Sequence, residues 1–294
     1  MLPAFYRRCG LVGRRREPAA GRRPARALLL AAALLGGAGR AAEEPLWTVG
    51  AGLGVAGLED YRGAEAVHLY PVPFPYLIYH GDFLKSDRKG IRGLLFDQDR
   101  LQINLSGNAT APGHDDSARF GMTDLKPTVE VGPSFDVRLL GSPAARTTLT
   151  LEVPVRAAYT IEWSPRFIGT TLSPSLNLDA RAPFGLEGWN VGLEAAALFA
   201  DSRYDGYFYS VAPRYATAYR PAYSAPGGFA GTATTLTFSK RFPKFWIGGF
   251  LRRDALGDAV FDPSPLVQVN HYWSAGVGIA WIIRESDRRV EVPD

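Results

Sequence analysis

The chain has 294 residues with 33 basic and 29 acidic side chains, and its formal net charge is +4. Nine basic residues and one acidic residue lie within residues 1–42, so residues 43–294 keep 24 basic and 28 acidic residues and a net charge of about −4. This balance excludes the basic surface of a nucleic-acid-binding protein, and the single cysteine, Cys9, excludes disulfides and thiol chemistry after residue 42.

Residues 1–42 follow the order of a secretory signal peptide. Eight arginines precede the apolar run Ala27–Leu35, and mostly small residues follow it up to Ala42. Cleavage is therefore predicted after Ala41 or Ala42, which leaves residues 43–294 as one outer-membrane β-barrel domain. The apolar run is too short to cross a membrane as a helix, and its retention as an N-terminal anchor is the alternative.

The first and last predicted strands, Trp47–Gly57 and Tyr272–Ile283, share one design. In both, large apolar residues alternate with small ones, so each strand has one apolar face and one small or polar face. No stretch of 18 or more apolar residues follows residue 42, which excludes membrane-spanning helices. A sheet in lipid must pair its first strand with its last, because unpaired backbone groups are costly there. The prediction is an all-β fold, a transmembrane antiparallel up-and-down β-barrel.

Ten further strands bring the expected number to about twelve, within a range of roughly 10 to 14. They cover residues 66–72, 76–85, 90–97, 101–106, 128–140, 148–159, 172–179, 189–200, 231–242 and 245–254. Pro71, Pro73 and Pro75 are expected to separate the first two of these strands. Short turns on one side alternate with longer loops on the other, which is the pattern of outer-membrane barrels with both termini in the periplasm.

Charged residues on the predicted polar faces are candidates for the barrel lumen. A hairpin centred near Pro143 would bring Glu130 opposite Arg156 as a cross-strand charge pair. The candidates are Glu130, Asp136, Arg138, Glu152, Arg156 and Glu194.

Aromatic residues near the predicted strand ends fit the girdles that barrels place at the membrane interfaces. The candidates are Trp47, Trp163, Trp189, Trp246, Trp273 and Trp281. The alternative is a soluble barrel with these rings in its core, but its interior would have to be the apolar side.

The catalytic inventory is thin, so no enzyme, cofactor or metal site is predicted. No zinc-protease, nucleophile-elbow or phosphate-loop motif occurs. Residues His114–Ser117 combine suitable residue types, but neighbours within one loop do not build a catalytic triad. A lipid-modifying enzyme in which His271 orients a serine is kept as a hypothesis beside the two non-enzymatic functions given below. The tyrosine-rich segment Tyr204–Tyr223 is expected to fold inward as a plug or to form a contact surface.

Four segments carry a resemblance to the MltA-interacting protein (MipA/OmpV) family of outer-membrane proteins: Tyr70–Phe83, His114–Gly132, Tyr204–Gly228 and Ser264–Trp281. The resemblance implies an outer-membrane barrel without catalytic residues, surrounded by lipid and lipopolysaccharide. It also implies a scaffold that brings a lytic transglycosylase together with a peptidoglycan synthase.

Two functions follow as expectations from these features. In a scaffold, the turn Gly141–Ala145 and the tail Arg284–Asp294 would lie on the partner side. The alternative is a narrow pore for small solutes or ions, with the charged lumen residues along its wall.

Overall fold

The computed structural model describes residues 41–80, 84–87, 90–98, 100–110, 117–142 and 145–293. Nearly all of the predicted signal peptide lies outside this part of the chain, as do His114, Asp115 and Asp116. Among the described residues, no helix has the length and apolar character needed to cross a membrane.

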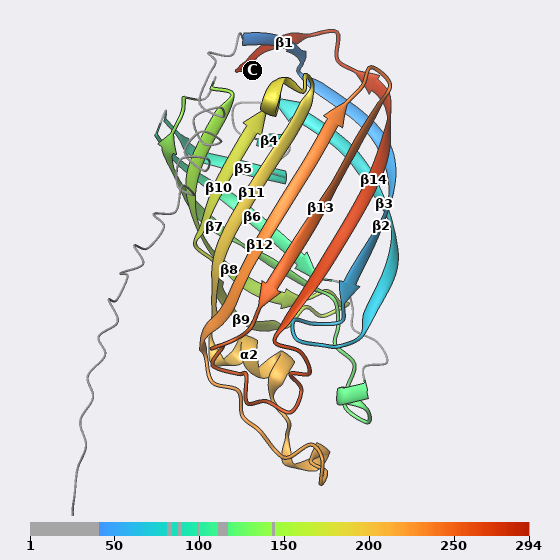
Figure 1. Cartoon of the computed structure of the whole chain (residues 1–294), viewed down its shortest axis with the longest axis vertical. Coiled ribbons are helices and arrows are strands. Elements are labelled where there is room, and N and C mark those ends of the chain that lie inside the picture. Colours follow the sequence, from blue (N-terminus) through green and yellow to red (C-terminus); the bar gives the residue numbers. More distant parts are fainter. Residues whose placement is uncertain are drawn as a thin grey trace, which may run out of the picture.

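One large antiparallel sheet dominates the fold (Figure 1). Its strands are β2 (Trp47–Glu59), β3 (Val67–His80), β4 (Leu84–Asp87), β5 (Gly90–Asp97), β6 (Leu101–Thr110), β7 (Thr128–Leu140), β8 (Thr147–Thr160), β9 (Phe167–Leu172), β10 (Ser175–Arg181), β11 (Trp189–Ala200), β12 (Gly228–Arg241), β13 (Phe245–Ala255) and β14 (His271–Glu285). The helices are short: α2 (Ser202–Tyr209), and the 3-10 turns η1 (Ser117–Arg119), η2 (Pro183–Gly185) and η3 (Pro213–Tyr215).

The strand order is β10-β11-β12-β13-β14-β2-β3-β4-β5-β6-β7-β8-β9, with additional pairings of β10 with β8 and β11 with β9. Strands β9 and β10 therefore share one place between β8 and β11, so the prediction of about twelve strands is confirmed. The predicted contact between the first and last strands of the sheet is confirmed as well, because Val277 of β14 pairs with Val55 of β2 and Ala280 pairs with Gly52.

Strand β3 differs from the prediction of two strands separated by prolines. It runs unbroken, and Pro71, Pro73 and Pro75 pair with successive alternate residues of β2. The backbone N–H groups of residues two apart in a strand point toward the same adjacent strand, so the N–H groups that the three prolines lack are all missing from one edge of β3. On its other side β3 pairs with β4 through Tyr79 and His80, beyond the prolines.

The faces of the sheet reverse the arrangement of a water-soluble protein. On β14, Trp273 and Val277 are both 57% exposed, whereas the intervening Ser274 is 4% exposed. Other strands repeat this alternation, which confirms the predicted apolar and small faces. Large apolar side chains outside include Leu53, Val55, Leu69, Leu105, Val131, Phe135, Leu176, Leu193, Leu236 and Leu251. Polar side chains buried on the inner face include Asn104, Glu130, Ser134, Asp136, Thr171, Ser175 and Asp254.

The two ends of the sheet carry different connections. One end has short turns and a separate two-stranded sheet, in which β1 (Ala41–Pro45) pairs with β15 (Arg289–Pro293). The other end has the long loops and helix α2, as Figure 1 shows. Leu46 N donates to Arg288 O at 2.8 Å, and Ser286 N donates to Trp47 O at 2.9 Å, so both ends of the described chain are held together.

Two glycines on neighbouring strands provide a test of packing within the large sheet, which is called the wall below. A Cβ atom on Gly132 of β7 would lie 2.0 Å from the carbonyl oxygen of Val155, whereas on Gly107 of β6 the nearest atom would be 3.4 Å away. We expect Gly132→Ala to lower the free energy of unfolding by about 1–3 kcal/mol, as overpacking does, and Gly107→Ala to change it much less. Urea unfolding of the detergent-solubilised protein measures both, and equal effects would contradict this packing.

Candidate functional site

The long-loop end folds into a structured cap, defined as residues 60–66, 117–127, 201–227 and 256–270. Its centre is apolar, with Leu256, Phe261 and Leu266 fully buried. Tyr209 stacks on Phe261 with ring centroids 3.7 Å apart, and the Tyr61 hydroxyl donates to Leu266 O at 2.7 Å. The cap therefore has a hydrophobic core of its own at one end of the sheet.

Helix α2 anchors the tyrosine-rich segment to the wall. Asp201 caps the helix, because its carboxylate accepts from the backbone N–H groups of Arg203 and Tyr204 at 3.0 and 2.8 Å. The Tyr204 hydroxyl donates to Glu130 at 2.9 Å, and the hydroxyl of Thr171 on β9 donates to the same carboxylate at 3.0 Å. The first part of the segment thus packs inward, as one of its two predicted arrangements requires.

A second polar contact ties the cap to the wall through Asp254, which is 1% exposed at the end of β13. Its carboxylate accepts from Arg62 Nε at 2.9 Å and from Arg252 Nε at 2.6 Å. Arg62 also donates to Ala230 O at 2.7 Å, and its own carbonyl accepts from the Tyr209 hydroxyl at 2.9 Å. Charge-assisted hydrogen bonds of this kind are stronger than neutral ones, so Asp254 joins loop and strand firmly.

Asp205 of α2 is a buried carboxyl group without a hydrogen-bond partner among the described residues. It is 1% exposed, and both of its oxygens lack a donor. Burial raises the pKa of Asp205 to about 7, although the nearby Arg62 guanidinium lowers it and Asp201 raises it further. The group is therefore neutral in the closed cap at mildly acidic pH.

We call the cap closed when it is packed as in this structure and open when α2 has come away from its neighbours. Because the pKa of Asp205 is raised to about 7, we predict that the free energy difference favouring the closed cap decreases as pH rises from about 4 to about 7. In an opened cap, Asp205 would ionise near its ordinary pKa of about 3.9, so the open state releases its proton first. The closed cap then loses at most about 1.4 kcal/mol per pH unit across this window, and the loss levels off above pH 7.

Hydrogen exchange of the α2 amides, corrected for intrinsic exchange rates, measures this dependence. Asp205→Asn should remove it, while Asp262→Asn, a matched acidic-to-amide change elsewhere in the cap, should retain it. An unchanged slope in Asp205→Asn would contradict the role of this carboxyl.

The predicted lumen charges lie at least partly buried in the wall. Asp136 accepts from Asn104 Nδ2 at 2.7 Å and from Ser134 Oγ at 2.6 Å. Arg156 donates to Ser106 Oγ at 3.0 Å and to Ser173 Oγ at 3.3 Å. Those that are half-buried include Arg138, Glu152, Arg156 and Glu194.

The predicted pairing of Glu130 with Arg156 is wrong. Glu130 pairs with Ala158, and Arg156 pairs with Thr171 on the next strand. Beside the turn, Leu140 pairs with Leu149, whereas a hairpin centred on Pro143 would pair it with Arg146. The bulge between Arg138 and Leu140 takes up one residue of this difference, so Glu130 lies opposite Ala158. Glu130 instead receives the hydrogen bond from the cap.

The tryptophans proposed for the girdles occupy different environments. Trp273 and Trp281 are exposed on the outer face, and Trp163 is fully exposed in a loop. Trp47 and Trp189 are half-buried.

Trp246 does not fit the predicted girdle, because its side chain lies on the inner face of the sheet. It pairs directly with the fully buried Ala280, and directly paired residues share a face. Its ring contacts Phe74 and Tyr76 with centroid distances of 6.3 and 5.7 Å. The signal in the sequence is Gly248, two residues after Trp246 and on the same face of the strand. A Cβ atom at this position would clash with the Trp246 ring, so glycine makes room for the ring.

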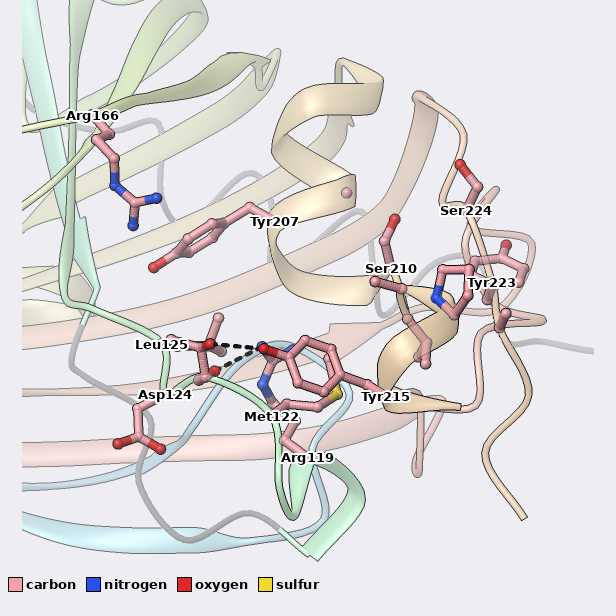
Figure 2. Close-up of a pocket in the computed structure, with 16 residues that line it drawn as sticks. Arg119, Met122, Asp124, Leu125, Arg166, Tyr207, Ser210, Tyr215, Tyr223 and Ser224 are labelled. Atoms are coloured by element: carbon pink, nitrogen blue, oxygen red, sulfur yellow. Dashed lines mark hydrogen bonds between the residues drawn. The ribbon is translucent and has the colours of Figure 1, made fainter. Parts of the chain in front are cut away.

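A pocket of about 640 Å³ opens in the cap between α2, the segment 117–125 and the loop 210–224, and Arg166, from the connection between β8 and β9 outside the cap, also lines it. Figure 2 shows Tyr207 and Tyr215 reaching toward the segment 117–125 from the helix and from the loop. Arg220 holds two of these segments together, donating to Ala118 O at 2.8 Å and to Tyr215 O at 2.9 Å. Sequence reasoning did not identify this pocket, because its lining comes from segments far apart in the chain.

The described residues contain no group of three or more histidine, cysteine or carboxylate side chains that could hold a metal ion. His271, the residue of the enzyme hypothesis, is exposed at the start of β14. The described residues thus form a sheet with an inner polar face, a cap and a pocket.

The sequence matches the family described as MltA-interacting protein MipA over residues 50–283. This range covers most of the chain and includes the cap and most of the large sheet. The chain belongs to the MipA family. The resemblance inferred from the four segments is therefore confirmed.

Comparison with solved structures finds two crystal structures of the Pseudomonas putida toluene transporter TodX. The first is 10% identical, with a TM-score of 0.26, and the match covers 84% of this chain and 69% of that one. The second is 11% identical, with a TM-score of 0.24 and coverage of 85% and 69%. No curated protein matches the chain.

Proposed function

We propose that the chain, after removal of its signal peptide, forms a closed transmembrane barrel in the outer membrane and serves as a non-enzymatic scaffold. The observation that carries the proposal is the reversed sheet, with apolar side chains outside and polar ones within. A bilayer is the solvent that such an exterior fits. The lipid and lipopolysaccharide of that membrane would be its surroundings.

The cap supports a scaffold over a freely open pore. Its hydrophobic core and its contacts with Glu130 and Asp254 hold it against the wall. On the inner face, Phe74, Tyr76 and Trp246 form an aromatic cluster that occupies further space. Membership of a family described as MltA-interacting supports a lytic transglycosylase as partner, with a peptidoglycan synthase as the second partner of the proposed scaffold.

The partner surface in this proposal is the short-turn end, which would face the periplasm. There, the ladder of β1 and β15 presents Glu43, Glu44 and Arg289. His80 Nε2 lies 3.1 Å from Glu44 Oε2, which ties this small sheet to β3. The proposed surface also includes the turn Gly141–Ala145, of which residues 143 and 144 lie outside the described chain.

Barrel architecture can be tested on the outer face near the first and last strands. Leu53 is 54% exposed and pairs with Ile279, so Leu53→Arg would place a charge in lipid at a cost of up to about 2–4 kcal/mol. We expect this variant to fold less completely in lipid vesicles than Leu53→Ile. The shift in gel mobility between unboiled and boiled protein measures the folded fraction, and equal folding of both variants would contradict a lipid-facing Leu53.

The scaffold role can be tested by shortening the chain after Glu285, which removes β15. We expect cross-linking in intact envelopes to capture a murein-degrading enzyme with the full chain and to lose it with the shortened one. Arg220→Ala, at the opposite end of the fold, is the control that should retain the partner. Folding of all three is checked by the mobility shift, and capture that is absent or unaffected by truncation would overturn the assignment.

A narrow pore for small solutes or ions is the second candidate, favoured by the charged side chains on the inner face, such as Glu130 and Asp136. Planar-bilayer recordings of the pure folded protein separate the two candidates. A closed baseline supports the scaffold, whereas stepwise conductance supports the pore.

A further inference from the structure

The pocket in the cap has walls that are mainly apolar and aromatic. Tyr207, Tyr215 and Tyr223 line it, together with Met122, Leu125 and Val211. Its volume of about 640 Å³ lies within the range of sites that hold small molecules, roughly 300–1,000 Å³. The size and the lining together indicate a small organic ligand rather than a bare ion.

Two of the tyrosine hydroxyls already have partners within the cap. Tyr207 accepts from the backbone N–H of Lys126 at 2.9 Å, and the Tyr215 hydroxyl lies 3.3 Å from Thr123 Oγ1. These residues therefore offer ring surface more than hydrogen bonds to a ligand. Among the described residues, the lining contains no asparagine, glutamine or glutamate, and its planar polar side chains are Arg119, Asp124 and Arg166, fewer than the many hydroxyls of a saccharide would need.

The charged groups of the lining favour an anion. Among the described lining residues, Arg119 and Arg166 are the cations and Asp124 is the acidic residue. In Figure 2 the Asp124 carboxylate points away from the rings of Tyr207 and Tyr215, whereas the Arg166 guanidinium lies near the Tyr207 hydroxyl. Arg166 bonds Glu162 through Nε at 2.9 Å, which leaves its two terminal amino groups to pair with a carboxylate.

We infer that this pocket binds a small ring compound, aromatic or otherwise flat and apolar, that bears one carboxylate. The ring packs against Tyr207, Tyr215 and Met122, and the carboxylate accepts hydrogen bonds from Arg166. This inference does not rest on the proposed scaffold role, because the pocket lies in the cap and the partner surface at the opposite end.

Binding of 2-naphthoate to the full folded chain in lipid nanodiscs tests the inference, with empty nanodiscs as background. We expect saturable binding by calorimetry, and binding of the neutral analogue 2-naphthylmethanol that is weaker by about tenfold or more, the usual effect of a charge-assisted hydrogen bond. No saturable binding, or equal binding of the two probes, would overturn it.

Variants separate the roles of charge and ring. Arg166→Gln should abolish the preference for naphthoate over the alcohol, whereas Arg203→Gln, which removes a cation of α2 outside the pocket, should preserve it. Tyr215→Ala should weaken both probes together. If Arg203→Gln reduced the preference as much as Arg166→Gln, the effect would be general charge attraction and the assigned site would be wrong.

Discussion

The alternation of side chains along paired strands is the constraint on which the rest of the fold depends. Once large apolar residues face outward, every residue between them faces inward, and a shift of one residue would exchange the two faces. The inner face must then satisfy its polar groups within the protein. Asp136 with Asn104 and Ser134, and Glu130 with Thr171 and Tyr204, do so through short side-chain contacts. The wall and the cap are joined by this requirement.

Sequence periodicity predicted the wall well because each strand carries its own signal. The opening and closing strands, the overall strand number and the direction of each face could all be read from alternate residues. Errors arose where the outcome depended on a neighbouring strand. The prolines of β3 are unfavourable in a sheet unless all their missing N–H groups fall on one edge of the strand, which only the pairing with β2 shows. The residue opposite Glu130 depended on the length of a turn and on a bulge.

The cap and its pocket were much less predictable. Tyr204–Tyr223 was recognised as unusual, yet its inward packing requires Glu130 from β7, Arg62 from an earlier loop and Phe261 from a later one. These contacts join residues up to 147 positions apart, as between Arg62 and Tyr209, and no local pattern encodes them. Trp246 illustrates the same limit, because its inward orientation follows from its register with Ala280.

The ladder between β1 and β15 brings both ends of the described chain to the same place. Strand β1 begins at Ala41, next to the predicted cleavage site of the leader, and it pairs with Arg289–Pro293 at the other end of the described chain. The register of this ladder can therefore be completed only after translation has passed Pro293. An affinity tag or fluorescent protein inserted beside this ladder would lie at the short-turn end of the fold, so a reporter intended to leave that end accessible belongs in the loops at the opposite end.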